Sequence, residues 1–299
     1  IVPSNYYFIN DIYVDIKRQI AIRQKSDKEL EYWCKSSYGL SLPFIFQLIL
    51  VKNNQSFIHS GAFSYGEKGV VMSAFGGIGK TAVLARVAYK EGFKVMGDDL
   101  NILNENGSIL SYPRPFCLYR YHKPLFKNFY TKNRLTYLRP VLFWRVYGRF
   151  LKEIHQRTGI NLEISKYITN WTGYITASPF NIFNMKDIEL RSLPLDYAFI
   201  IGRHNKGSKV LITKASKEEF ADFSLNVLYH EWDYMDKSLK GYLTFNKVGL
   251  STYFENVKKI MKKSVSNVDY IYKIELPISM KMEKSTEELF FQIQKIINE

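Results

Sequence analysis

The sequence predicts an α/β protein with a central mixed β-sheet and flanking helices. Apolar runs of strand length, such as 70–72, 93–96 and 195–201, are interspersed with segments whose apolar residues recur at helical spacing. Of the 299 residues, 46% are hydrophobic and 16% aromatic, which is enough to build a large folded core. We expect a strand-rich segment over 1–55 that packs on a core domain spanning 56–299.

The N-terminal segment combines short strands with one or two helices. Apolar and polar side chains alternate over 6–22 about Asn10-Asp11, a pattern that predicts two strands joined by a turn. The charged stretch 26–34 begins with a residue that suits a helix cap and predicts a short helix. The apolar stretch 44–51 predicts a buried helix or strand.

Residues 69–81 carry the strongest chemical signal. A short apolar strand leads into a glycine-rich turn, and a segment of helical spacing follows Lys80-Thr81. This is the context of a phosphate-binding loop, in which glycines let backbone N–H groups surround phosphate oxygens at a helix N-terminus. The alternative is a tight strand-to-helix turn followed by a surface lysine. The residues that we expect to bind nucleotide phosphates are Gly76, Gly77, Ile78, Gly79, Lys80, Thr81 and Ala82.

Two carboxylates follow the next predicted strand. Asp98 and Asp99 come after the apolar run 93–96 and Gly97. Beside a phosphate loop, one carboxylate can hold Mg²⁺ while the other accepts a proton from an attacking hydroxyl. The alternative is an Asp-Asp turn that opens a loop. The sequence thus predicts a metal site of Thr81, Asp98 and Asp99.

The segment 112–157 is strongly basic and aromatic. Eleven Lys or Arg residues stand against one acid, Glu153, so this segment supplies +10 of the formal net charge of +14. Three interpretations remain open: a solvated basic face over an aromatic core, a cradle for an acidic acceptor, or contact with nucleic acid or a membrane surface. No nucleic-acid-binding motif supports the last of them. We treat 112–172 as a basic aromatic insertion, with a helix over 142–153.

The C-terminal third alternates strands and helices. The runs 195–201 and 209–213 predict a hairpin with a basic tip, and 270–276 predicts a further strand. Helical spacing predicts helices over 217–228, 251–263 and 285–297, the last capped by Ser285.

Composition excludes several classes of protein. Cys34 and Cys117 are too few for a disulfide framework or a zinc site, which indicates a reducing, cytoplasmic compartment. The longest apolar run, 42–51, is too short to span a bilayer. The large positive charge favours an acidic partner.

Residues 59–120 resemble the HPr kinase/phosphorylase family and its relatives of the phosphoenolpyruvate-carboxykinase-like fold. His59 precedes Ala74 by fifteen positions, as the family's histidine precedes its loop. Gly77-Ile78-Gly79-Lys80-Thr81 matches the family's Gly-x-Gly-Lys-Ser/Thr, and 91–99 is similar to its glycine, strand and two aspartates. The similarity covers about a fifth of the chain, by the count of these positions.

The resemblance implies an ATP- and Mg²⁺-dependent kinase. The loop amides and Lys80 would hold the phosphates, and Thr81 with Asp98 or Asp99 would hold Mg²⁺. Asp98 would activate the acceptor hydroxyl, and His59 would lie near the transferring phosphoryl group. Three arginines are candidates for stabilising charge: Arg114, Arg120 and Arg203.

The chain also departs from the family pattern. Ala74 replaces the first glycine of the loop, Gly76 replaces its serine, and Ala82 stands where bifunctional members carry an acid. We find no counterpart of the later phosphorolysis motif, so we expect a kinase that phosphorylates a serine of an acidic peptide or protein. Two alternatives remain: a small-molecule kinase of the same fold acting on free serine, a sugar or a similar alcohol, and a nucleotide-binding regulatory module without turnover. Because relatives often form oligomers, a homo-oligomer is compatible with the resemblance.

Overall fold

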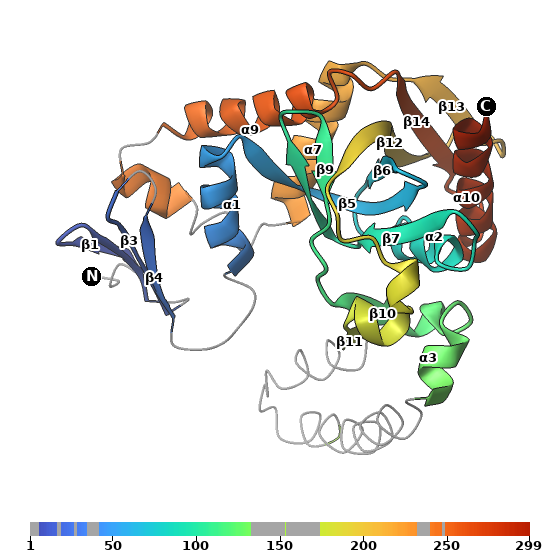
Figure 1. Ribbon diagram of the computed structural model, residues 1–299, viewed down its shortest axis with the longest axis horizontal. Helices are drawn as coiled ribbons and strands as arrows, with labels where there is room; N and C mark the ends of the chain where they lie inside the picture. The colour runs from blue at the N-terminus through green and yellow to red at the C-terminus, as the bar shows by residue number, and fades with distance from the viewer. Residues whose placement is uncertain are drawn as a thin grey trace.

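A computed structural model of the protein describes residues 6–16, 19–26, 29–34, 42–132, 153, 174–231, 240–246 and 249–299. Its centre is an eight-stranded mixed sheet (Figure 1). The strands of this sheet are β5 (Gln55–Tyr65), β6 (Lys68–Ser73), β7 (Phe93–Gly97), β8 (Leu100–Asn104), β9 (Ser108–Leu110), β12 (Leu193–His204), β13 (Leu211–Lys214) and β14 (Tyr270–Pro277). Their order is β13-β14-β12-β6-β5-β8-β9, and β7 also pairs with β5. The predicted α/β class with a large mixed sheet is therefore confirmed.

The carboxyl ends of four parallel strands meet at one edge of this sheet. Strand β12 pairs in parallel with both β6 and β14. Strands β6 and β7 each pair antiparallel with β5, so they too run in the same direction. In α/β sheets, the crevice outside the carboxyl ends of the strands is the usual place for a ligand. The glycine loop and the two predicted carboxylates both lie at this edge.

Apolar side chains fill both faces of the sheet. Successive residues of a strand point to opposite faces, so Val71 and Val70 belong to different clusters of the core. One face packs against α7 (Lys217–Glu231), α9 (Leu250–Ser264) and α1 (Leu42–Lys52), and the other against α2 (Lys80–Val87) and α10 (Met282–Asn298). Burial on both faces explains why the central strands read as nearly continuous apolar runs.

The N-terminal residues form a separate four-stranded antiparallel sheet, at the left of Figure 1. The turn predicted at Asn10-Asp11 is present, and both residues have positive φ, as a tight hairpin turn requires. The helix predicted over 26–34 is wrong, because Leu30–Cys34 pairs with its neighbour as a strand. The apolar stretch 44–51 is helical and lies within α1. The strands of this sheet are β1 (Tyr6–Ile9), β2 (Ile12–Asp15), β3 (Ile20–Gln24) and β4 (Leu30–Cys34).

The predicted C-terminal hairpin is also wrong. Strand β13 does not pair with β12, because β14 lies between them, parallel to β12 and antiparallel to β13. The apolar Ile271, Ile274 and Leu276 of β14 are buried, which favours its interior position over β13. The predicted helices and the strand near 270–276 are present, but α10 begins at Met282 rather than at a cap on Ser285.

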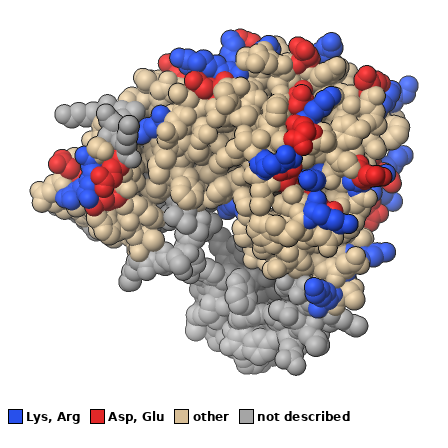
Figure 2. All heavy atoms as spheres, in the orientation of Figure 1, with Lys and Arg blue, Asp and Glu red and all other residues tan. Residues whose placement is uncertain are grey.

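Part of the basic aromatic segment is described. A two-stranded sheet pairs β10 (Phe116–Tyr119) with β11 (Tyr174–Ala177), with the short helices η1 (Arg120–His122), α3 (Lys127–Lys132), α6 (Pro179–Ile182) and η2 (Met185–Asp187) nearby in the chain. The helix predicted over 142–153 lies outside the described residues except for Glu153. On the face shown in Figure 2, basic and acidic side chains intermingle. Within the described ranges, no helix combines the length and apolar character needed to cross a bilayer.

We expect the core around β12 to dominate stability. Phe199 is fully buried, so Phe199→Ala should lower the free energy of unfolding by about 3–5 kcal/mol through lost burial and a cavity. Phe291 on α10 is 58% exposed, and Phe291→Ala should cost less than about 1 kcal/mol. Urea unfolding of both variants tests the assignment, and equal losses would contradict it.

Candidate active site

The glycine loop joins β6 to α2. Gly77 and Gly79 have φ of 76° and 114°, conformations that L side chains rarely adopt. Ala74 has no positive φ and is fully buried in the core, so a methyl group is accommodated there. The loop therefore keeps glycine where its backbone demands glycine, and the departure at Ala74 does not alter its path.

Lys80 is buried against the loop, with 7% of its surface exposed. Its Nζ donates hydrogen bonds to the carbonyl oxygens of Ala74 at 2.6 Å and Phe75 at 3.1 Å, and lies 3.0 Å from Nε2 of His59. Three acceptors thus match the three N–H groups of an ammonium. The alternative of a surface lysine is wrong.

The two carboxylates lie at a kink between two strands that share one partner. Strand β7 pairs with one half of β5 and β8 with the other, and Asp99 between them has φ of 73°. Ser60 N still donates to Asp99 O at 3.2 Å across the kink. Asp98 Oδ2 accepts a hydrogen bond of 2.6 Å from Thr81 Oγ1. The structure thereby brings the predicted hydroxyl and carboxylate ligands together.

Asp99 lies between a histidine and an arginine. Its Oδ2 accepts a hydrogen bond of 2.5 Å from Arg114 Nη1. Its Oδ1 lies 3.3 Å from His59 Nδ1, although the direction of approach does not satisfy hydrogen-bond geometry. Because the other ring nitrogen faces Lys80, four side chains form a continuous series of contacts. In order they are Arg114, Asp99, His59 and Lys80.

Burial sets the protonation states in this series. It raises the pKa of Asp98 to about 6, against the opposing effects of Thr81 and Lys80. It lowers the pKa of His59 to about 2, helped by the charges of Lys80 and Arg114, so His59 is neutral. Burial also raises the pKa of Asp99, but 44% of that side chain is exposed and Arg114 lies against it, so we assign Asp99 the ionised form.

Two opposing effects act on the pKa of the Lys80 ammonium. Burial lowers the pKa of its ammonium, and the carboxylates of Asp98, Asp99 and Glu231 act in the other direction. The last of these acids has no counterpart in the sequence-based prediction. Glu231 Oε1 accepts a hydrogen bond of 2.6 Å from the backbone N–H of Gly76. No sequence pattern points to this contact, because it joins residues 155 positions apart.

The predicted arginines differ in their placement. Arg114 contacts Asp99, as described above. Arg203 lies near the carboxyl end of β12, at the same sheet edge as the loop, and its guanidinium approaches Met282 Sδ at 3.8 Å. Arg120 begins η1, but its side chain lies outside the described part of the structure.

The start of the basic aromatic segment borders the carboxylates. Along β10, Phe116 and Leu118 are buried, whereas Cys117 and Tyr119 are exposed on the other face. Desolvation and the charges of Asp99 and Asp98 raise the pKa of the Cys117 thiol to about 11. This exposed face of β10 is therefore close enough to the carboxylates for their charge to affect the Cys117 thiol.

The oxygen donors at the site suit magnesium. In the part of the chain that the structure describes, no three His, Cys, Asp or Glu side chains converge as a metal cluster. Mg²⁺ commonly takes only one or two protein carboxylates and completes its octahedron with phosphate oxygens and water. The Thr81 hydroxyl beside the Asp98 carboxylate offers such a partial ligand set.

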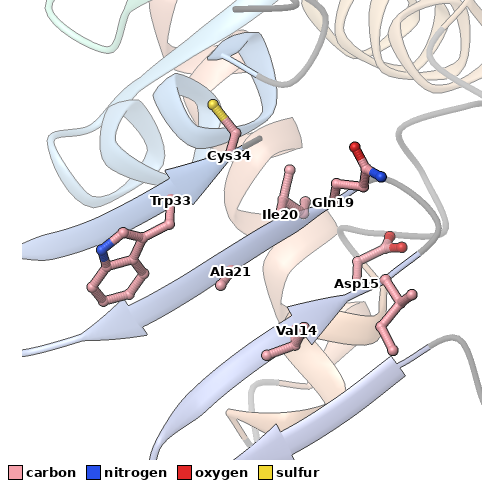
Figure 3. Close-up of a pocket in the computed structure, with 8 residues that line it drawn as sticks. Val14, Asp15, Gln19, Ile20, Ala21, Trp33 and Cys34 are labelled. Carbon is pink, nitrogen blue, oxygen red and sulfur yellow. The ribbon is translucent and has the colours of Figure 1, made fainter. Parts of the chain in front are cut away.

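A shallow depression lies elsewhere, on the N-terminal sheet (Figure 3). It encloses about 210 Å³, and Val14, Asp15, Ala21, Trp33 and Cys34 are among the residues that line it. None of the predicted site residues lines it. The site defined by Lys80 and Asp98 is thus distinct from this depression.

No protein-family model matches this sequence, and no curated protein is significantly similar to it. The resemblance to HPr kinase/phosphorylase therefore rests on the motif residues alone and stays a prediction.

We expect Asp98→Asn to stabilise the protein at neutral pH. The raised pKa means that folding disfavours the ionised carboxylate, so wild type loses stability as pH rises from about 4 to 6. At pH 7.5 the neutral amide should add about 2 kcal/mol to the free energy of unfolding, and this gain should shrink towards pH 4. Urea titrations at several pH values measure it. Asp222→Asn, which removes an exposed carboxylate, is the control, and the same pH dependence in both variants would contradict the assignment.

The two positive-φ glycines of the loop should respond differently to alanine. A Cβ at Gly79 would lie 2.6 Å from Thr286 Cγ2 of α10, whereas at Gly77 no atom lies within 4 Å. Gly79→Ala should cost about 2–3 kcal/mol of unfolding free energy and Gly77→Ala about 1 kcal/mol. Thermal and urea unfolding check this, and an equal cost at both positions would show that the contact with α10 does not constrain the loop.

Proposed function

We propose that the protein is an ATP- and Mg²⁺-dependent kinase that phosphorylates a hydroxyl group, most readily a serine of an acidic peptide or protein. The observation that carries the proposal is the buried Lys80 ammonium, held between the loop carbonyls and His59 beside the Thr81–Asp98 pair. A buried cation, a glycine loop and two carboxylates at one sheet edge supply what phosphoryl transfer needs.

The loop and Lys80 bind the phosphates in this account. N–H groups of the loop would donate to phosphate oxygens, and Lys80 would exchange its hydrogen bonds with the loop carbonyls for bonds to the outer phosphates. His59 is neutral and accepts from Lys80 through Nε2, so it orients the ammonium without adding charge. Thr81 would hold Mg²⁺ together with the phosphate oxygens, and the ion when bound would supply positive charge to those oxygens, which leaves the Asp98 carboxylate free to accept a proton.

Asp98 acts as the base. The acceptor oxygen forms a bond to the γ-phosphorus, the bond to the bridging oxygen breaks, ADP leaves, and Asp98 receives the hydroxyl proton. A pKa of about 6 keeps this carboxylate ionised at neutral pH while leaving it more basic than an ordinary aspartate. Asp99, held by Arg114, is less suited to accept a proton because an arginine favours its ionised form.

We infer the class of acceptor from the positive charge of the segment next to the carboxylates. Arg114, at the start of the basic aromatic segment 112–157, contacts Asp99, and the exposed face of β10 in the same segment borders both carboxylates. A polymer with acidic residues would find complementary charge along that segment. The specific phosphoenolpyruvate-carboxykinase-like architecture is part of this proposal and is supported by the strand, loop and double-aspartate order.

Single-turnover transfer from labelled ATP to lysate peptides tests the proposal. Lys80→Met should reduce phosphoryl transfer at least about 100-fold because it removes the cation from the phosphates. Lys90→Met, which changes an exposed lysine after the same helix, should leave transfer unchanged.

The products distinguish the alternatives. Labelled serine peptides support the proposed acceptor, and a labelled free alcohol would support a small-molecule kinase instead. Binding of Mg·ATP without transfer to any acceptor would contradict the kinase and support a regulatory module.

A further inference from the structure

We infer that Glu231 competes with nucleotide phosphate for the backbone N–H of Gly76, so that an internal carboxylate closes the phosphate-binding loop until nucleotide displaces it. The inference rests on the proposed function, because it takes the loop to be the phosphate site. It goes beyond that function by assigning a controlling role to a residue that takes no part in the transfer.

The contact itself resembles the binding of an anion. A carboxylate oxygen lies 2.6 Å from a loop N–H, within the range of a charge-assisted hydrogen bond. In a phosphate-binding loop these N–H groups are the donors that phosphate oxygens use. Glu231 therefore takes a donor that a phosphate would otherwise occupy.

The glycine at position 76 leaves little room beside this carboxylate. A Cβ placed on Gly76 would lie 3.2 Å from Oε1 of Glu231, tighter than most Cβ contacts. Gly76 does not have a positive φ, so its backbone alone does not require glycine. A Cβ at position 76 would therefore require the Glu231 carboxylate to shift by a few tenths of an ångström.

Contacts of other residues hold helix α7 beside the loop. Ser224 Oγ donates a hydrogen bond to Ser73 Oγ at 2.9 Å, and the ring centroids of Phe75 and Phe223 lie 5.7 Å apart. The helix therefore packs against the end of β6 and the start of the loop. These contacts do not involve Glu231. Rotation of its flexible side chain can release the Gly76 N–H without moving the helix or the loop.

The negative charge of the carboxylates around the loop disfavours phosphate binding. Glu231 lies close enough to Lys80 and Asp99 to influence both, so three carboxylates, including Asp98, surround the site's two cations, Lys80 and Arg114. A polyphosphate must enter against this negative charge. Removing the contact should therefore tighten binding, whereas a residue that binds nucleotide would weaken binding when lost.

Calorimetric titration with inorganic tripolyphosphate tests the inference on the full chain. Glu231→Gln should bind tripolyphosphate about tenfold more tightly than wild type, because a neutral amide oxygen competes for the Gly76 N–H less strongly than a carboxylate does. Glu231→Asp keeps the charge but is one methylene shorter, so it should also bind more tightly because it cannot reach Gly76. Glu219→Gln makes the same change as Glu231→Gln at the other end of α7 and should match wild type.

The outcomes separate this inference from the proposed function. Unchanged or weaker binding by Glu231→Gln, with wild type still binding, would overturn the competition and leave the phosphate site intact. Tighter binding by Glu231→Gln but not by Glu231→Asp would overturn it in favour of long-range charge alone. If none of the proteins binds tripolyphosphate, the phosphate site fails and the inference fails with it.

A second readout is independent of phosphate. The Gly76 amide proton should resonate downfield in wild type and move upfield in Glu231→Gln, because the short bond to a carboxylate is lost. An unchanged Gly76 resonance would overturn the contact on which the inference depends.

Discussion

Burial of a lysine ammonium is the constraint on which the rest of the site depends. An unpaired buried cation costs several kcal/mol, so the chain must surround Lys80 with acceptors or counter-charges. Two loop carbonyls and His59 accept its hydrogen bonds, and Asp98, Asp99 and Glu231 provide negative charge. The position of His59 and the grouping of the carboxylates around Lys80 both meet this requirement.

The sheet supplies the geometry that makes such a grouping feasible. Parallel strands bring the loop and the two aspartates to one edge, while β5, which pairs with β6 on one side and with β7 and β8 on the other, contributes His59. The kink at Asp99 turns two adjacent side chains in different directions, one towards Thr81 and the other towards Arg114. Two carboxylates adjacent in sequence thereby acquire different surroundings.

Local signals explain how much the sequence could predict. The loop at 76–81 and the turn at Asn10-Asp11 depend on glycine and asparagine chemistry that reads directly from neighbouring residues. Strand pairing is non-local, so the sequence pattern pairs β13 with the wrong strand, and at 30–34 pairing with β3 overrides the local preference for a helix. The contact between Glu231 and Gly76 cannot be predicted for the same reason, since only the packing of α7 brings these two residues together.

The structure of the protein with a non-hydrolysable ATP analogue and Mg²⁺ tests the central claim most directly. The account predicts that Lys80 Nζ leaves the carbonyls of Ala74 and Phe75 for the outer phosphates, with Mg²⁺ beside Thr81 and Asp98. It also predicts that Glu231 no longer contacts Gly76. An analogue bound away from the loop, with Lys80 still on both carbonyls, would contradict the assignment of this edge as a phosphoryl-transfer site.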